Sequence, residues 1–159
     1  MELTRLDHTF FGNEVRRHLG AIMLEKGLVT HAQLDEALEE RSRVGGLLGD
    51  TLVRLGYAFE DDIGRVLAEQ QGVDFVDINV LSVDPQAAIL VPPELGNEIK
   101  AIPVRFGDDG SLIVAVADPL DDTVASSLRQ ALNCPFTLVV ATSSAITNAW
   151  RKVAGRIGL

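Results

Sequence analysis

The sequence predicts an α+β protein, in which an N-terminal all-helical subdomain is followed by a small α/β subdomain with one sheet. The first observation is a helix-pair pattern that recurs after 29 residues within residues 13–72. The second is the alternation of strand and helix patterns over residues 73–155. The third is the composition, because 47% hydrophobic and 23% charged residues in a chain of 159 are typical of a globular protein. We therefore expect two subdomains, 13–72 and 73–155.

The repeat is visible when the sequence is shifted by 29 residues. The shift aligns HLGAIMLEKG (18–27) with LLGDTLVRLG (47–56), and HAQLDEALEER (31–41) with EDDIGRVLAEQ (60–70). A repeat of this length is typical of one supersecondary unit used twice. We expect each unit to be a pair of helices separated by a turn.

Capping residues set the expected helix ends. Asn13 can cap the first helix, and Gly27 supplies a left-handed stop. Thr30 and Gln33 have the spacing of a capping box at the start of the second helix. The second unit has Phe59 where the first has Thr30, so we expect its second helix to be capped less well, unless Glu60 or Asp61 shifts the boundary.

Gly20 and Gly49 occupy the same position of the two units, near the start of a helical pattern. Glycine inside a helix costs about 1 kcal/mol relative to alanine, so a repeated glycine needs a reason. One explanation is close contact between helices. The other is a flat ligand that approaches the backbone at a helix N-terminus. The sequence leaves both open.

The second subdomain alternates strands and helices. Strands are expected over residues 73–78, 101–106, 111–117 and 136–142, with GDDG (107–110) as a hairpin turn. Helices are expected to start at Asp84-Pro85, at Pro92-Pro93, at Asp122 as N-cap, and at Ser143 or Ser144. Trp150 shares one face of the last helix with Ile146 and Val153, which predicts a core position.

Several classes of enzyme lack their motifs in this chain. No lysine lies in a GK[ST] context, so the phosphate loop of a nucleotide hydrolase is absent from the sequence. One cysteine, Cys134, permits neither a zinc-finger spacing nor an internal disulfide, and we interpret it as a small buried residue. Asp118, Asp121 and Asp122 are interpreted as a turn and a helix N-cap rather than as catalytic carboxylates. We expect no enzyme activity and no metal.

The charge is acidic and evenly distributed. Residues 1–72 hold 8 Lys/Arg against 13 Asp/Glu, and residues 73–159 hold 6 against 10, for a net charge of −9. Such a surface argues against duplex nucleic acid and anionic membranes as partners. No apolar run reaches the roughly 18 residues of a membrane span, and the first residues lack a signal-peptide pattern. We therefore expect a cytoplasmic protein without direct membrane insertion.

The doubled units resemble the MshEN-type domain. In that family a 24-residue unit, RLGxxLxxxGxxxxxxLxxxLxxQ, is used twice, and here the copies are His18–Arg41 and Leu47–Gln70. The segments GVDFVDINVLSVDP and IPVRFGDDGSLIVAVADPLDD resemble the family's accompanying subdomain. The family forms the N-terminal part of ATPases of type II secretion and type IV pilus assembly, and many members bind cyclic di-GMP. The resemblance thus implies a regulatory domain with that ligand.

The resemblance also implies which residues bind the ligand. They are Arg17, His18, Leu19, Gly20, Met23, Gly27, Leu34, Leu38, Arg41, Leu47, Leu48, Gly49, Asp50, Leu52, Gly56, Ile63, Leu67 and Gln70.

This chain departs from the family pattern at three of these positions. His18 and Leu47 replace the family's arginine, and Arg41 replaces the closing glutamine of the first copy, whereas Gln70 keeps it in the second. Asp50 has two interpretations, an acceptor for guanine N–H groups or a solvated acid favoured by the helix dipole.

Two main hypotheses follow. In the first, the chain is a non-catalytic regulatory domain that binds cyclic di-GMP and couples it to a motor ATPase domain or another effector. In the second, it is a ligand-free docking module for the cytoplasmic platform of a secretion or pilus machine. The paired short helices also suggest a helix-turn-helix DNA binder, which the acidic charge opposes.

Overall fold

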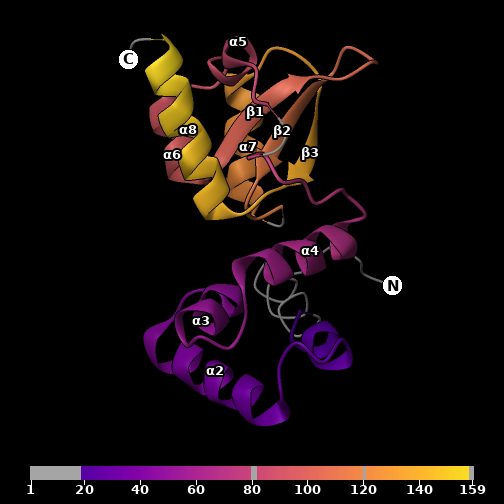
Figure 1. The fold of residues 1–159 in the computed structure, drawn as a ribbon, viewed down its shortest axis with the longest axis vertical. Helices are drawn as coiled ribbons and strands as arrows, with labels where there is room; N and C mark the ends of the chain where they lie inside the picture. The colour runs from indigo at the N-terminus through magenta and orange to yellow at the C-terminus, as the bar shows by residue number, and fades with distance from the viewer. Residues whose placement is uncertain (1–18, 80–81, 120, 158–159) are drawn as a thin grey trace, which may run out of the picture. The chain divides into compact units, whose positions relative to one another are not determined.

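The computed structural model describes residues 19–79, 82–119 and 121–157 (Figure 1). The chain forms two units, and the division between them follows Val66, inside a helix. The expected functional subdomains, 13–72 and 73–155, stay a prediction. The helical elements of the first part are a helix over 19–25, α2 (His31–Val44), α3 (Leu48–Arg54) and α4 (Glu60–Gln71).

Side-chain caps distinguish the starts of α2 and α4. The predicted capping box of α2 is confirmed: Gln33 N–H donates to Thr30 Oγ1 at 3.1 Å, and Thr30 N–H donates to Gln33 Oε1 at 3.0 Å. Phe59 directly precedes α4 and has no side-chain oxygen with which to accept a hydrogen bond. Its side chain is instead 78% exposed. The start of α2 is therefore held by two hydrogen bonds that the residue before α4 cannot make.

Gly27 and Gly56 end the first helix of each pair in the left-handed conformation, with φ of 69° and 78°. After each glycine, the next residue donates its N–H to the carbonyl five residues back, at 2.9 Å in both turns. This geometry is that of a Schellman stop. The predicted stop at Gly27 is confirmed.

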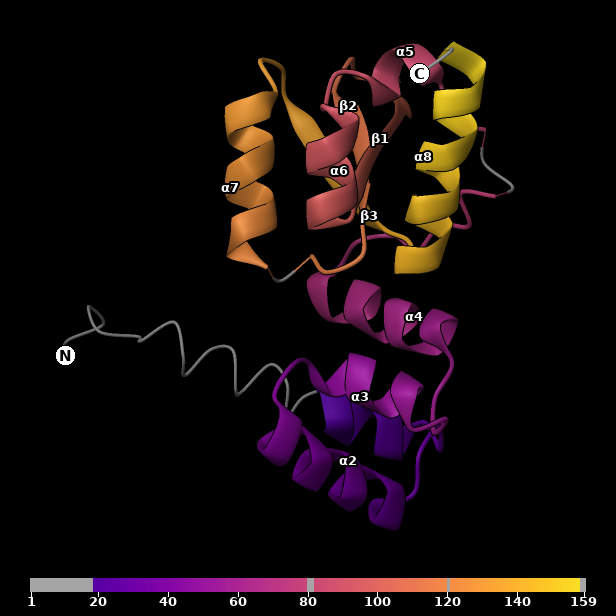
Figure 2. The same cartoon turned by 90° about the vertical axis from the view of Figure 1, so that its left-hand side faces the viewer.

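The second unit contains a three-stranded sheet in the order β1-β2-β3. Its elements are α5 (Pro85–Ala88), α6 (Pro93–Ile99), β1 (Ala101–Phe106), β2 (Leu112–Val116), α7 (Asp122–Ala131), β3 (Phe136–Val140) and α8 (Ser143–Ile157). Strands β1 and β2 are antiparallel, whereas β2 and β3 are parallel. Figure 2 shows α7 and α8 on opposite sides of this sheet. The α+β fold class is confirmed.

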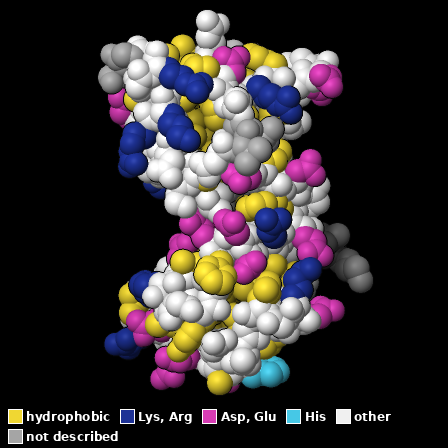
Figure 3. Space-filling view, in the orientation of Figure 1, with side chains coloured by type: hydrophobic (Ala, Val, Ile, Leu, Met, Phe, Trp, Pro, Cys, Tyr) yellow, Lys and Arg dark blue, Asp and Glu magenta, His cyan; other side chains and the backbone are white. Residues whose placement is uncertain are grey.

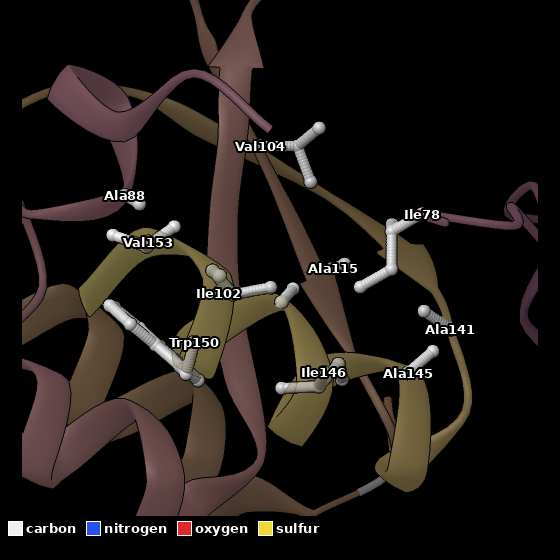
Figure 4. Packing of buried hydrophobic residues seen from close by; sticks show 11 residues of the cluster. Ile78, Ala88, Ile102, Val104, Ala115, Ala141, Ala145, Ile146, Trp150 and Val153 are labelled. Carbon is white, nitrogen blue, oxygen red and sulfur yellow. The ribbon is translucent and has the colours of Figure 1, made fainter. Parts of the chain in front are cut away.

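Each side of the sheet has its own apolar core. One core joins β1 and β2 to α7, through residues such as Val114, Leu128 and Val116. The other joins the sheet to α8 and includes Ile102, Ile146 and Trp150 (Figure 4). The alternating side chains of the strands thus supply both layers.

Trp150 occupies the core position that its helical spacing predicts. Only 3% of its surface is exposed, and its indole Nε1–H donates to Ala101 O at 2.9 Å. Gly96 on α6 makes room for the ring, because a Cβ at that position would lie 2.2 Å from Trp150 Cζ2. The buried indole therefore has both its apolar contacts and its hydrogen-bond partner.

The strand expected over 73–78 is wrong in its length, since the structure has one bridge there, between Phe75 and Val140. Val76 N–H donates to Val140 O, and Val140 N–H donates to Asp74 O, both at 2.8 Å. Asp77 Oδ1 then accepts from Asn79 N–H at 3.0 Å, which turns the backbone. The chain leaves the sheet after a single pairing.

Element boundaries also differ from the expectation. The N-cap of α7 is Asp121, which accepts from Thr123 N–H at 2.9 Å, and not Asp122, which is the first helical residue. The interpretation of this acidic cluster as a turn and N-cap is confirmed. Strands β2 and β3 are shorter than predicted, 112–116 and 136–140, because Ala117 and Ala141 keep only terminal hydrogen bonds.

Candidate functional site

Most of the apolar residues implied as ligand contacts lie in the interior of the helical part. The fully or nearly buried ones, each at most 9% exposed, are Leu19, Met23, Leu34, Leu48, Leu52 and Ile63. Leu38, Leu47 and Leu67 are half-buried, and Gly27 and Gly56 are exposed in their turns. Arg17 and His18 lie outside the described residues. The buried leucines hold the helices together whatever they do for a ligand.

Gly20 and Gly49 lie where helices approach closely. A Cβ on Gly20 would be 3.1 Å from Leu34 Cδ1, and one on Gly49 would be 2.9 Å from Ile63 Cγ2. The 29-residue shift that pairs the two glycines also pairs Leu34 with Ile63. Close helix contact thus accounts for both glycines, while ligand approach at the same positions and the repeat as a whole stay predictions.

The N-terminal turn of α3 contains one exposed acid and one buried hydroxyl. Asp50 is exposed in this first turn, where the helix dipole favours a negative charge. Thr51 is only 1% exposed, and its hydroxyl donates to Leu47 O at 3.0 Å. The sequence analysis missed the burial of Thr51, because a threonine beside an aspartate gives no apolar signal. Of these two polar groups, Asp50 is the one open to a ligand.

Arg41 in the first unit and Gln70, which follows the division at Val66, each have a buried polar atom without a partner among the described residues. Among the described residues, two buried side-chain polar atoms make no hydrogen bond: Nη1 of Arg41 and Oε1 of Gln70. Leaving such a group unpaired costs about 1–3 kcal/mol, so each instance needs an explanation. These two residues are 29 positions apart and close the two copies of the repeat. The sequence picked out both residues, but it carried no signal that their polar atoms are buried.

Arg43 provides a contrast on the same helix. Its guanidinium is exposed and donates to Glu40 Oε2, and this hydrogen bond raises the pKa of Arg43. Tyr57 makes a similar surface contact by donating its hydroxyl to Glu36, which raises the pKa of Tyr57. Arg43, Glu40 and Glu36 on α2 are therefore paired at the surface, while Arg41 Nη1 is buried and unpaired.

Neither a metal centre nor a membrane span is found in the described part of the chain. No three His, Cys, Asp or Glu side chains within residues 19–79, 82–119 and 121–157 are grouped to hold a metal ion. No helix in those ranges is long and apolar enough to cross a bilayer. Cys134 is half-buried beside the core that faces α7.

The fold agrees with the comparison to protein families. The chain belongs to the MshEN domain family, whose model matches residues 71–158. That range covers the α/β unit together with the last residue of α4. The family assignment therefore depends on the second part of the chain, and the helical repeat precedes the matched range.

Two curated relatives extend the similarity over the helical part. The type IV pilus assembly ATPase PilB of Thermus thermophilus is 30% identical over 144 residues, which is 90% of this chain and 16% of that protein. The bacteriophage adsorption protein B of Escherichia coli is 29% identical over 136 residues, 85% of this chain and 18% of that protein. This chain thus spans less than a fifth of each relative.

A solved structure shares the fold across both parts. It is a structure of MshE with cdg, cyclic di-GMP, and it superposes with a TM-score of 0.72 at 31% identity. The match covers 85% of this chain and 97% of that one.

Proposed function

We propose that this chain is a non-catalytic regulatory domain that binds cyclic di-GMP through the helical residues 13–72 and couples the bound state to an effector. The observation that carries the proposal is the pair of buried, unpartnered polar atoms on Arg41 and Gln70. Their positions close the two copies of the repeat, where a ligand with two similar halves has equivalent contacts. The similarity to MshE with its ligand supports the same assignment.

The chemistry of the ligand suits these groups. Guanine offers O6 and N7 as acceptors and N1–H and N2–H as donors, and each phosphate offers further acceptors. Arg41 Nη1 can donate only, so it takes guanine O6 or N7 or a phosphate oxygen. Gln70 Oε1 and the Asp50 carboxylate can accept, so they take the N–H groups of a guanine. Donor and acceptor requirements are thus met by one kind of ligand.

The departures from the family pattern set the expected affinity. His18 and Leu47 stand where the family has arginine, and an arginine fork on guanine is worth about 1–3 kcal/mol. Losing two such contacts weakens binding by about 10²- to 10⁴-fold relative to a site that has both. Arg41 offsets part of this loss if it contacts the ligand. Arg41→Gln, which restores the family residue, is expected to leave affinity unchanged or to improve it, unless the Arg41 guanidinium contacts a phosphate or stacks on a base.

The effector is expected to be a larger protein or machine. One relative is a pilus assembly ATPase and another a phage adsorption protein, and both are several times longer than this chain. We propose that the partner is a motor ATPase domain or a platform protein of a secretion or pilus system, and that the domain acts in the cytoplasm. The residues that bind ligand require no further cofactor.

The alternative is a docking module that has kept the fold and lost the ligand. The residues at positions 18, 41 and 47 favour it, because each removes a family contact. Under this alternative, the buried and unpaired Arg41 Nη1 lowers the stability of the fold and has no binding role.

A calorimetric titration distinguishes the ligand-binding regulatory domain from the ligand-free docking module. The full chain is titrated with cyclic di-GMP at one salt concentration, with GTP as the control ligand. We expect cyclic di-GMP alone to bind, and Asp50→Ala to lose about 1–3 kcal/mol of binding free energy, since guanine N–H groups lose their acceptor. Asp35→Ala, which removes an exposed acid from α2, is the matched control and is expected to have no effect. If the parent binds no tighter than the millimolar range and Asp50→Ala behaves like the parent, the ligand hypothesis fails and the docking module remains.

A further inference from the structure

The two edges of the sheet are protected very differently. At the β1 edge, Ala101 O accepts from the Trp150 indole at 2.9 Å, and Val104 O accepts from Asp84 N–H at 2.8 Å. Pro103 has no N–H to offer, and the register of β1 shifts directly after it. Side-chain caps, proline and a bulge are the devices that prevent another strand from pairing with an edge. The β1 edge is closed.

The hydrogen bonds of β3 show which of its residues face outward. Leu112 N–H donates to Pro135 O at 2.9 Å, and Ala141 N–H donates to Val116 O at 3.1 Å. Because backbone groups alternate in direction along a strand, the odd-numbered residues 135–141 face β2. The N–H and C=O groups of the even-numbered residues face away from the sheet.

Two of these outward residues have no backbone partner in the part of the chain that the structure describes. The outward N–H of Val140 donates to Asp74 O, and its C=O accepts from Val76 N–H. Phe136 and Leu138 have no backbone partner on that side among residues 19–79, 82–119 and 121–157. Their two N–H and two C=O groups form an open ladder at the start of β3.

The open edge lacks protective features. The strand sequence FTLVV contains no charge, no proline and no glycine, and Thr137 between the two open residues is exposed. Strand β3 is also less buried than β2 beside it. An uncharged, β-branched edge of this kind is a template for another strand.

Acidic side chains lie at both ends of the sheet, beside the C-terminal end of β3 and in the hairpin that precedes β2. Exposed Asp74 and Asp77 flank the pairing at Val140, and exposed Asp108 and Asp109 form the hairpin turn before β2, whose first residue pairs with Phe136. Figure 3 shows acidic side chains at the tip of that hairpin. Hydrogen bonds from Ser111 lower the pKa of Asp109, so its carboxylate is charged at neutral pH.

We propose that the open edge of β3 binds an extended segment of another polypeptide, which adds to the sheet as a fourth strand and carries basic residues at its two ends. Main-chain hydrogen bonds to Phe136 and Leu138 supply the pairing, and the acids at both ends select a basic partner. A second copy of this chain fits less well, because each copy has a net charge of −9. This surface is independent of the cyclic di-GMP proposal.

Amide hydrogen exchange measured by NMR on the full chain tests the proposal. The probe is a short peptide with alternating threonine and valine between two terminal lysines, and the control peptide has glutamates in place of the lysines. In the free protein we expect the Phe136 and Leu138 amides to exchange fast and the Thr137 and Val139 amides slowly. The lysine peptide should slow exchange at Phe136 and Leu138 by about tenfold or more, as expected for a new hydrogen bond, and the glutamate peptide should not.

Two variants test the contact itself. Leu138→Pro removes the outward N–H and also replaces a side chain that packs against the core facing α7. It should reduce the affinity for the lysine peptide by about tenfold while the Thr137 and Val139 amides stay protected. If that variant does not fold, Thr137→Lys places a blocking charge on the edge, and Thr123→Lys on α7 is its matched control. Only Thr137→Lys should lower the affinity for the lysine peptide.

Four results overturn the proposal. One is slow exchange at Phe136 and Leu138 in the free, dilute protein, which means that the edge is already covered. Another is protection that grows with protein concentration alone, which identifies a second copy as the occupant. The third is equal protection by the two peptides or by neither, and the fourth is unchanged binding to both edge variants.

Discussion

The α/β unit and the helices before it treat their buried polar groups in opposite ways. In the α/β unit, the Trp150 indole donates to Ala101 O, and Thr142 Oγ1 accepts from Ala145 N–H at 3.2 Å. In the helical part, Arg41 Nη1 is buried without a partner. Buried polar groups are normally paired within the fold, so an unpaired one needs an explanation, and we propose a bound ligand as that explanation. The α/β unit thus pairs these buried polar groups within the fold, and we propose that the helices carry the ligand function.

The largest expected effect is on the α/β unit. Trp150→Ala removes the largest side chain of its core and leaves Ala101 O unpaired, so it should lower the free energy of unfolding by about 3–5 kcal/mol. Chemical denaturation of the parent and the variant measures this. Trp150→Phe keeps most of the apolar area and should cost less, about 1–3 kcal/mol for the unpaired carbonyl. An unchanged midpoint for Trp150→Ala would contradict the role of Trp150 in this core.

A smaller effect is expected from the glycines of the helical part. Gly49→Ala places a Cβ 2.9 Å from Ile63 Cγ2, a methyl fixed to a branched carbon, so the helices must separate. Overpacking costs about 1–3 kcal/mol, and the gain in helix propensity of about 1 kcal/mol offsets part of it. Gly20→Ala meets the flexible end of Leu34 at 3.1 Å and should be nearly neutral. Thermal unfolding of both variants checks this difference, and a more stable Gly49→Ala would show that the contact is not limiting.

The smallest effects concern the helix caps. Thr30→Ala removes the capping box of α2 and should cost about 1 kcal/mol. Phe59→Ser introduces a capping oxygen at the start of α4 and should raise the free energy of unfolding by about 0.5–1 kcal/mol. Urea denaturation of the two variants should give shifts of opposite sign. Two shifts of the same sign would mean that Phe59 has a packing role that its exposure does not reveal.

The sequence predicted much of the fold because its signals are local. The Thr30 capping box, the Gly27 stop and the GDDG hairpin each depend on a few neighbouring residues, and all three are present. The strand predicted over 73–78 was wrong in its length. Strand composition is a local property, whereas pairing depends on how much of β3 the segment can reach. The register of that pairing, one residue at Val140, is a tertiary property.

The candidate site shows the same division. Gly20 and Gly49 stood out in the sequence as unusual, but the sequence could not choose between a ligand and a packing contact. The structure supplies the packing partner for each, Leu34 and Ile63. For Arg41 the sequence supplied only a substitution within a motif. Its buried, unpaired Nη1 depends on the surroundings of one atom, which no spacing pattern encodes.

Arg41 and Arg43 offer the most direct test of the ligand function. Both lie on α2, but Arg41 Nη1 is buried and unpaired, whereas Arg43 is exposed and paired with Glu40. The parent, Arg41→Ala and Arg43→Ala are titrated with cyclic di-GMP by calorimetry. Each substitution removes one positive charge, so a difference between the two variants reports on the buried Arg41 group. We expect Arg41→Ala to lose about 1–3 kcal/mol of binding free energy, and Arg43→Ala to bind like the parent. Equal affinities for both variants and the parent, or no binding by the parent, would contradict the assignment of the helices as the ligand site.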